Sequence, residues 1–260
     1  MTLRDPAERI RIGEQQQSEL LAAPVDEPST LLDASWRDYV FSEIWTRSGL
    51  DRRSRFLISI AGAACEGGRP DVLDGYIRGA LTCEALTVTE LREAALHLAV
   101  YAGWSRGTAM NAAITRVAHT LQLDEPTFDP ICDATWDPQE RLGAGAENFK
   151  SVMIFPAPPP NAPYFEGGIL NFVFAEMWMR PGLDQRARRW VTLVGVADSS
   201  STTPIRTHIY AAMASGNATL PEMHEFVLQY AVHGGWPRAS VLQAVVFEMG
   251  ERVAKGLPYQ

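Results

Sequence analysis

Two stretches of this 260-residue chain are near copies of each other: residues 45–55 read WTRSGLDRRSR, and residues 178–188 read WMRPGLDQRAR. Seven of the eleven positions are identical at an offset of 133. Farther along, AVYAGWSR (99–106) returns as AVHGGWPR (231–238), with five of eight positions identical at an offset of 132. Similarity at a fixed spacing is typical of a repeated structural unit. We therefore predict that the chain carries two tandem copies of one unit.

A proline-rich segment lies between the two copies. The stretch FPAPPPNAPYF (155–165) contains five of the seventeen prolines of the chain. Proline fixes φ and lacks an amide donor, so such a run is extended and acts as a semi-rigid connector. We therefore divide the chain into a first repeat (1–125), an insert with a proline-rich linker (126–164) and a second repeat (165–260).

Both repeats are predicted to be helical. Asp51 is well placed as an N-cap in front of an apolar stretch with helical spacing. TVTE (87–90) and TLPE (219–222) fit the capping box, in which a threonine hydroxyl and a glutamate carboxylate satisfy free amides of the first turn. Strand signals are poor, and we interpret VTLVGVA (191–197) as a buried helix because its counterpart FLISIAGA has helical periodicity. The predicted fold class is all-α, with two tandem helical bundles.

Composition excludes several classes of function. The net charge of −8, from 31 acidic and 23 basic residues, argues against nucleic acid or an anionic membrane as a partner. No apolar run approaches the roughly 18 to 20 residues that span a membrane, and the N-terminus lacks the apolar core of a signal peptide. Cys65, Cys83 and Cys132 form no C-x-x-C pair, which supports neither a disulfide framework nor a cysteine zinc site. We expect a soluble cytoplasmic protein without a metal ion.

Each repeat places a polar column on the helix that the capping box opens. The columns, spaced i, i+4, i+8, are Glu93, His97 and Tyr101 in the first repeat and Glu225, Gln229 and His233 in the second. A carboxylate one turn from an imidazole can fix its tautomer or raise its basicity, as general acid–base catalysis requires. On the preceding helix, His208 takes the place of Tyr76. The alternative is that these are ordinary polar positions on a solvated face, or buried hydrogen-bonded pairs.

Arginines and tryptophans recur with the repeat as well. The arginines that come in pairs are Arg53, Arg55, Arg186 and Arg188. Their planar guanidinium groups suit bidentate recognition of a carboxylate, although salt bridges on a helix surface would use the same spacing. Trp104 and Trp236 each follow a glycine at a helix end. They could line an apolar pocket or belong to the core.

The first repeat resembles the carboxymuconolactone decarboxylase family through WTRSGLDRRSR, the following Ile77-Arg-Gly-Ala-Leu, the Thr-x-x-Glu helix and AVYAGW. The second repeat resembles the same family through HIYAAMASGNATLPEMHEFVLQYAVHGGWP, which keeps the histidine that opens the family's H-x-x-x-A-L-x-x-G segment, here His208. The resemblance covers roughly residues 5–122 and 165–255.

The resemblance implies a fold, a reaction and an assembly. The fold would be the all-helical bundle shared with alkylhydroperoxidase-like proteins, and the reaction would be loss of carbon dioxide from a small carboxylated lactone without a cofactor. The chain would form a homo-oligomer, with three tandem chains making a ring. The corresponding segments AACEGG and VADSSSTT lack the redox C-x-x-C of the peroxidase branch. Peroxidase activity is therefore disfavoured.

The two repeats depart from the family pattern in different places. Tyr76 stands where the family has histidine, and His233 stands where it usually has tyrosine. Glu84 ends a segment that lacks the family's usual glycine, which the second repeat retains as Gly216. We infer that only one of two pockets keeps the ancestral chemistry and that its substrate has changed.

The leading hypothesis is a decarboxylase or related lyase. We expect His208 to be the principal acid–base group with Glu225 and His233 beside it, because the dienolate left by decarboxylation must be stabilised and then protonated. Arg186 or Arg188, or Arg53 or Arg55, would orient the substrate carboxylate. The other residues expected to contact substrate are Tyr76, Glu93, Tyr101, Trp104 and Trp236. The alternatives are a proton-transfer isomerase, cyclase or dehydratase in a biosynthetic pathway, and a catalytically silent protein that binds a ligand or serves in assembly.

Overall fold

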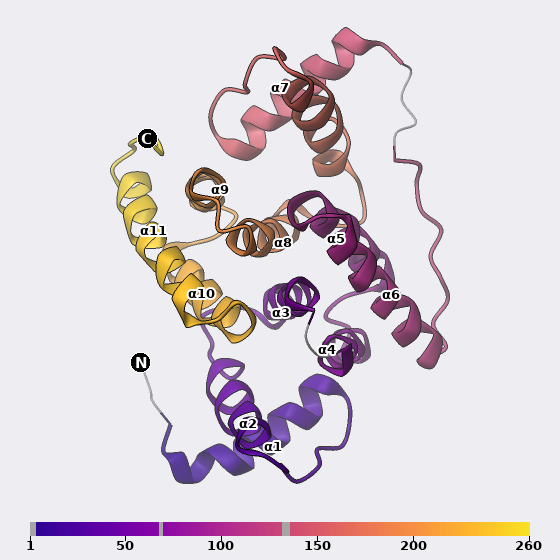
Figure 1. Cartoon of the computed structure of the whole chain (residues 1–260), viewed down its shortest axis with the longest axis vertical. Coiled ribbons are helices and arrows are strands. Elements are labelled where there is room, and N and C mark those ends of the chain that lie inside the picture. Colours follow the sequence, from indigo (N-terminus) through magenta and orange to yellow (C-terminus); the bar gives the residue numbers. More distant parts are fainter. Residues whose placement is uncertain (1–3, 68–69, 132–135) are drawn as a thin grey trace.

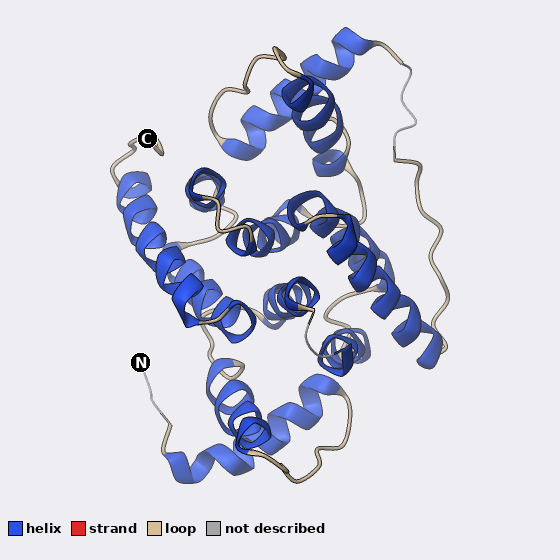
Figure 2. Ribbon diagram, in the orientation of Figure 1, coloured by secondary structure: helices blue, strands red, loops and turns tan. Residues whose placement is uncertain are grey.

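The computed structural model describes residues 4–67, 70–131 and 136–260, and within these ranges the chain is helical with no strand (Figure 2). In chain order the elements are α1 (Pro6–Leu21), α2 (Leu31–Ser35), η1 (Trp36–Ile44), α3 (Arg52–Glu66), α4 (Pro70–Thr82), α5 (Val88–Ala102), α6 (Trp104–Thr120), α7 (Pro138–Met153), η2 (Tyr164–Phe174), η3 (Met177–Met179), α8 (Gln185–Asp198), α9 (Thr202–Ala214), α10 (Leu220–Gly234) and α11 (Trp236–Ala254). The all-α prediction is confirmed, and VTLVGVA lies inside α8 as expected. None of the described helices combines the length and the apolarity needed to cross a membrane.

The starts of the central helices are fixed by their own local sequence. Thr87 accepts a hydrogen bond from the amide of Glu90, whose carboxylate accepts from the amide of Thr87, and this closes the predicted capping box of α5. Thr219 and Glu222 close the same box at the start of α10. The side chain of Asp51 accepts from an amide three residues on, at the start of α3. Each of these predicted caps is confirmed, and a cap of this kind stabilises its helix by about 1 kcal/mol.

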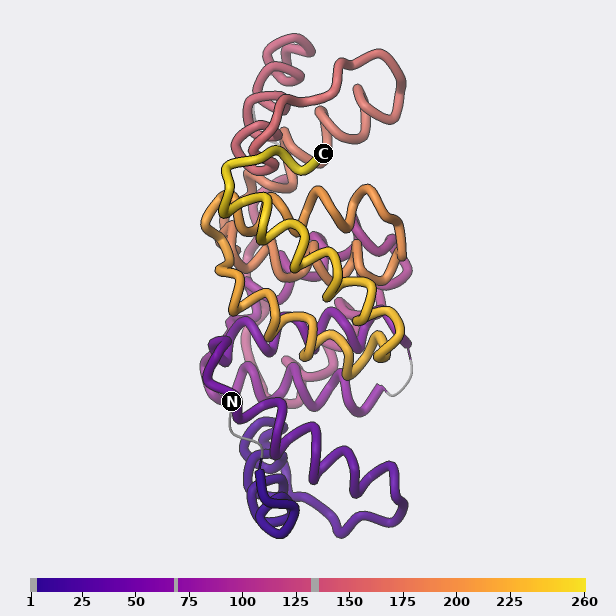
Figure 3. The backbone as a smooth tube through the Cα atoms, turned by 90° about the vertical axis from the view of Figure 1, so that its left-hand side faces the viewer, coloured from indigo at the N-terminus to yellow at the C-terminus, as the bar shows by residue number. Residues whose placement is uncertain are grey.

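The helices form three tiers along the long axis of the molecule (Figures 1 and 3). At one end α1 packs against η1, and at the other end α7 packs against η2. In the middle tier α3 contacts α8 and α10, while α5 contacts α6 and α8. One hydrophobic core runs through this tier and includes Phe56, Trp190 and Phe226, so the two halves of the chain share it.

Helix α7 lies within residues 126–164, the segment in which we expected an insert and a linker. It packs on η2 as α1 packs on η1. Both helices approach their partner closely at a glycine: a Cβ at Gly13 would lie 2.2 Å from the carbonyl oxygen of Arg37, and one at Gly145 would lie 2.0 Å from that of Leu170. The prolines that follow, at 156–160, are not helical. The second half therefore has a leading helix of its own, ahead of the proline-rich stretch.

The elements η1 and η2 are π-helices, which are rare in proteins and often lie near functional sites. Each leads the chain to a tryptophan in the middle tier, Trp45 after η1 and Trp178 in η3. The Trp45 ring lies 5.5 Å from that of Tyr76, and the Trp178 ring lies 4.8 Å from that of His97. The π-helices thus bring one indole to each of two polar clusters.

Candidate functional site

The polar columns of α5 and α10 each pack into the opposite half of the chain. On α5, Glu93, His97 and Tyr101 share one face, as their spacing predicts, and this face meets α8 and α9. The equivalent column of α10 meets α3 and α4. Each cluster therefore combines two helices from one half with one helix from the other (Figure 1).

The first cluster is centred on His208 in α9. The Tyr101 ring lies 5.3 Å from the His208 ring and nearly perpendicular to it. Trp178 donates its Nε1–H to the Tyr101 hydroxyl at 2.7 Å, which leaves the phenol its own proton to donate. Fully buried His97 has its Nε2 2.8 Å from the Thr192 Oγ1. These contacts hold the Tyr101 phenol next to the His208 imidazole.

A cavity of about 590 Å³ opens beside His208 and Tyr101. Its walls come from α5, α7, η2, the end of α8, the α8–α9 turn, α9, the proline-rich stretch and Tyr259 near the C-terminus. Six further aromatic rings line it: Phe149, Phe155, Tyr164, Phe165, Phe174 and Tyr259. Among the lining residues Thr207 and His208 are both buried, whereas Ser199, Ser201 and Thr203 are exposed. The polar groups able to do chemistry are therefore on the inner wall.

Burial sets the protonation of this inner wall. Burial, and then the charge of Arg189, lower the pKa of His208 to about 3, so the imidazole is neutral at pH 7. Burial raises the pKa of Tyr101 to about 12 against the opposing effects of the Trp178 hydrogen bond and of Arg189, so the phenol keeps its proton. A neutral imidazole and a protonated phenol are a proton acceptor and a hydrogen-bond donor on one cavity wall.

Arg189 is a functional candidate that the sequence reasoning missed. It is fully buried, and its guanidinium lies over the Trp178 ring at 4.9 Å. Its Nη2 donates to the carbonyl of Val152 at 2.7 Å, while its Nη1 has no hydrogen-bond partner among the described residues. Burial lowers the pKa of Arg189 to about 10, which still leaves it charged at neutral pH. The signal was present in the sequence, since Phe56 occupies the corresponding position in the first half of the chain.

Glu93 does not act as a free base in this arrangement. Its carboxylate accepts from Arg180 Nη2 at 2.6 Å and from Arg188 Nη2 at 3.2 Å, and all three side chains are buried. The second half mirrors it: Glu225 accepts from Arg47 at 2.6 Å and from Arg55 at 2.9 Å. Of the expected carboxylate-binding arginines, Arg188 and Arg55 are therefore occupied by protein carboxylates. These two buried ion clusters pin α5 and α10 to the opposite half.

We had expected Glu225 and His233 to lie beside His208, and the structure shows that they do not. Because α10 packs on α3, its column meets Tyr76 instead, and the His233 ring lies 5.6 Å from the Tyr76 ring. The residues that do lie with His208 are Tyr101 and His97 of α5. The spacing on α10 was interpreted correctly, but its partner helix was not.

The Tyr76 cluster is more completely filled. The Trp36 ring lies 5.9 Å from that of His233 and 6.5 Å from that of Tyr76. Gln229 donates to the Ser59 hydroxyl at 2.9 Å, the position that corresponds to the His97–Thr192 contact. The cavity that remains beside this cluster (the Tyr76 cavity) is lined by Trp36 and His233 among others, though not by Tyr76 itself, and measures about 180 Å³. Burial lowers the pKa of His233 to about 4.

Arg53 and Arg186 lie outside both cavities. Arg53 pairs with the capping-box residue Glu90 at 2.7 Å, and Arg186 pairs with its counterpart Glu222 at 2.8 Å. Arg186 also reaches Asp51, the N-cap of α3, at 3.1 Å. Their contacts correspond to the salt-bridge alternative, which joins the starts of α3, α5, α8 and α10.

Trp104 and Trp236 are exposed at the starts of α6 and α11. Each covers a π-helix of the opposite half: Trp104 stacks on Phe172 at 6.0 Å, and Trp236 lies 6.3 Å from Tyr39. Neither lines the His208 cavity. The two tryptophans therefore lie away from the His208 cluster.

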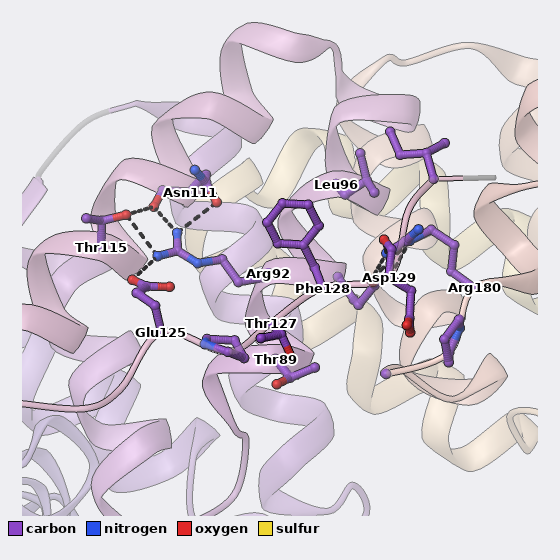
Figure 4. Close-up of a pocket in the computed structure, with 15 residues that line it drawn as sticks. Thr89, Arg92, Leu96, Asn111, Thr115, Glu125, Thr127, Phe128, Asp129 and Arg180 are labelled. Carbon is purple, nitrogen blue, oxygen red and sulfur yellow. Dashed lines mark hydrogen bonds and ion pairs between the residues drawn. The ribbon is translucent and has the colours of Figure 1, made fainter. Parts of the chain in front are cut away.

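A second large hollow, of about 590 Å³, lies between α5, α6 and residues 125–131 (Figure 4). Its two arginines are each paired with a carboxylate, Arg92 with Glu125 and Arg180 with Glu93, and Arg92 also donates to Asn111 at 2.8 Å and to Thr115 at 2.9 Å. Within the described residues no group of three or more His, Cys, Asp or Glu side chains could hold a metal ion. Cys65 and Cys83 are free thiols, and Cys132 lies outside the described residues.

Comparison with known proteins agrees with the resemblance seen in the sequence. Residues 31–116 match the model of the Carboxymuconolactone decarboxylase family. A curated relative, 4-carboxymuconolactone decarboxylase of Acinetobacter baylyi (strain ATCC 33305 / BD413 / ADP1), is 29% identical over 93 residues. The match covers 36% of this chain and 66% of the relative, which is slightly under two-thirds of the relative's length.

Proposed function

We propose that this chain is a member of the carboxymuconolactone decarboxylase family and a carboxy-lyase that works without a cofactor at the His208 cavity; the support is the match of residues 31–116 to the family model and the similarity to a curated 4-carboxymuconolactone decarboxylase. The substrate would be a carboxylated unsaturated lactone or enone. The observation that carries the proposal is that His208 and Tyr101 line the same open cavity, with their rings 5.3 Å apart. The Tyr76 cavity, of about 180 Å³, would be the catalytically silent one.

One residue of the cavity wall and one buried charge near it suit the electronic demand of decarboxylation. When the bond to the carboxylate breaks and carbon dioxide leaves, its electron pair is delocalised onto the substrate carbonyl as a dienolate. The Tyr101 hydroxyl, which keeps its proton, would donate a hydrogen bond to that oxygen. The buried charge of Arg189 lies behind Trp178, so it would stabilise the same anion through the low-dielectric interior without touching it.

His208 would handle the proton that replaces carbon dioxide. The imidazole is neutral in the empty cavity because burial and Arg189 lower its pKa to about 3. An anionic substrate beside the ring favours the protonated form and would raise that pKa. The imidazole can then take a proton from solvent and deliver it to the dienolate carbon, which balances the reaction as carboxylate plus proton giving carbon dioxide plus product.

We also propose that the chain arose by tandem duplication, with the two clusters as equivalent sites. The support is the nearly constant offset that relates the members of the clusters, such as Tyr76 to His208 and Glu93 to Glu225. The mirrored ion pairs follow the same offset, since Arg47–Glu225 corresponds to Arg180–Glu93. A single chain would then supply both halves of each site.

The experiment is a carbon dioxide release assay with carboxylated lactones and enones, starting with 4-carboxymuconolactone. We expect His208→Ala to reduce release about 10²- to 10⁴-fold, the usual contribution of general acid–base catalysis. His233→Ala is the matched control, because it removes the histidine that lines the smaller cavity of the other half and should leave the rate unchanged. Equal rates for wild type and the correctly folded His208→Ala variant would exclude the proposed role.

The same wall would also serve a proton-transfer isomerase, cyclase or dehydratase, since a neutral imidazole beside a phenol can enolise a carbonyl compound. Product formation that depends on His208 but releases no carbon dioxide would favour that second function. Absence of turnover together with tight ligand binding would favour the catalytically silent alternative. The open cavity beside His208 is what favours an enzyme over a filled, silent site.

A further inference from the structure

We propose that the His208 cavity accepts a mainly apolar, fused-ring aromatic molecule with a single carboxylate, larger than a compact monocyclic lactone. This inference rests on the proposed function for the location of the site. It adds the shape and the charge of the ligand, which neither the family match nor the catalytic groups determine.

The volume of the His208 cavity favours a ligand larger than a single small ring. The cavity measures about 590 Å³, which falls within the range of about 300 to 1,000 Å³ for pockets that bury drug-sized molecules. The corresponding Tyr76 cavity of the same chain measures about 180 Å³. A small lactone would leave most of the His208 cavity to water.

The walls of the His208 cavity are mainly aromatic. The rings that line the cavity stand at angles to one another: Phe149 lies 4.6 Å from Phe174 at 58° and 5.5 Å from Phe155 at 75°. Such surfaces offer both faces and edges to a flat aromatic guest. Aliphatic side chains such as Ile169 and Val173 complete the wall. The lining favours rigid rings over a flexible polar molecule.

The charges on and near the cavity wall limit the ligand to one carboxylate. None of the described residues that line the cavity is Asp, Glu, Lys or Arg. The charge of fully buried Arg189 acts on this wall, since it lowers the pKa of His208 and opposes the rise in the pKa of Tyr101, and one nitrogen of Arg189 is unpartnered among the described residues. One carboxylate can lie near that charge and near His208. A second carboxylate would be desolvated against aromatic rings with no cation to compensate it.

The volume of the His208 cavity comes from two segments that extend its wall and from one smaller side chain. Phe155, from the stretch after α7, contacts Tyr259 with ring centroids 4.7 Å apart, and Arg206 Nη2 donates to the Tyr259 carbonyl at 3.3 Å. These two segments extend the cavity wall beyond the helices. Ile169 aligns with Trp36, the indole that occupies the corresponding space in the Tyr76 cluster. The cavity therefore has additional walls from these two segments and a smaller side chain where the other cavity has an indole.

The test is a binding series measured by calorimetry with benzoate, 2-naphthoate and 9-anthracenecarboxylate on the wild-type chain. We expect affinity to rise about tenfold for each added ring, the gain from burying one further ring of apolar surface. 2,6-Naphthalenedicarboxylate should bind at least about tenfold more weakly than 2-naphthoate, because its second charge is not compensated. A flat series, a tighter dicarboxylate, or decanoate binding more tightly than 9-anthracenecarboxylate would overturn the proposal.

A variant locates the binding. Ile169→Trp, which copies Trp36, should abolish the gain from the second and third rings and leave benzoate affinity within about twofold. Trp36→Ile is the matched control on the other cavity and should leave the affinity of the His208 cavity for 9-anthracenecarboxylate unchanged. Should Ile169→Trp fail to fold, the wild-type series alone still decides. Because binding is measured without turnover, a rising series with no carbon dioxide release would contradict the proposed function only, and release with a flat series would contradict this inference only.

Discussion

The His208 cavity and the Tyr76 cavity occupy corresponding places in the two halves and differ in contents. Lining positions of one map onto the other at offsets of 133 and 132, as for Trp36 and Ile169 or for His233 and Tyr101. One measures about 590 Å³ and the other about 180 Å³. The central helices that position the groups correspond, so the difference comes from single substitutions such as Ile169 for Trp36 and from the proline-rich stretch and Tyr259, which line only the His208 cavity. Within the described residues, a large cavity, a histidine on α9 and a buried arginine that pairs with no carboxylate occur together only around His208.

The strongest way to challenge this comparison is to remove the carboxylate that pins each crossing helix. Glu93→Ala should lower the free energy of unfolding by about 3 to 5 kcal/mol, because it leaves buried cations unpaired. Glu225→Ala should cost less, because the side chain of its partner Arg47 is 32% exposed whereas that of Arg180, the partner of Glu93, is 6% exposed. Urea unfolding of both variants measures the difference. A smaller loss for Glu93→Ala than for Glu225→Ala would contradict the asymmetry.

The second prediction exchanges a residue between the halves. Arg189→Phe, which copies Phe56, should reduce turnover about 10²- to 10³-fold, the range for losing one preorganised electrostatic contact. Stability should change little, because replacing a buried charge by an apolar side chain of similar volume is often neutral. The pKa of His208 should also rise, since Arg189 contributes to lowering it.

Kinetics and histidine NMR on the same variant separate these effects. The account predicts a loss in kcat together with a raised pKa of His208. A variant with wild-type kcat, or with an unchanged His208 titration, would show that Arg189 has only a structural role.

The third prediction concerns pH. The pKa values of His97, His208 and His233 are lowered by burial, so the folded protein holds these rings neutral while the unfolded chain protonates them below about pH 6.5. Stability is therefore full above that pH and falls as the pH decreases, by about 1.4 kcal/mol per pH unit for each histidine. Urea unfolding between pH 7 and 5 should show this slope. Replacing His233 by Phe should reduce the slope by about one-third, and an unchanged slope would contradict the burial argument.

The smallest expected effect concerns the ends of α4 and α9. Glu84 adopts a φ of 56°, and Gly216, its counterpart in the second half, has a φ of 77°. A non-glycine residue in the left-handed region costs about 1 kcal/mol, so Glu84→Gly should raise the stability by about that amount. Gly216→Ala should lower it by a similar amount. Thermal unfolding of the two variants checks both signs, and a destabilised Glu84→Gly variant would show that its side chain contributes a contact that outweighs the strain.

Much of the fold was predictable because it is encoded locally. The capping boxes at Thr87 and Thr219 and the shared face of Glu93, His97 and Tyr101 follow from spacing alone. The neighbour of that face did not, because i, i+4 spacing says which residues align and not which helix they meet. For this reason Glu225 and His233 were assigned to His208 and not to Tyr76.

Two other features had signals in the sequence that were not used. Helices α1 and α7 share a proline start, a Glu-Arg pair and a glycine at an offset of 132, with Glu8-Arg9 matching Glu140-Arg141. Arg189 departs from the sequence similarity between the two halves, because the first half has Phe56 at the corresponding position. The cavity volume had no such signal, because it depends on how the proline-rich stretch and Tyr259 close over the helices.

The most direct test of the central claim, that only the His208 cavity is the working site, is a crystal structure of the chain with bound 2-naphthoate. The account predicts density against His208 and Tyr101, with the aromatic rings among Phe149 and Phe174, and no ligand in the Tyr76 cavity. Density beside Tyr76 and His233, with the His208 cavity empty, would contradict it.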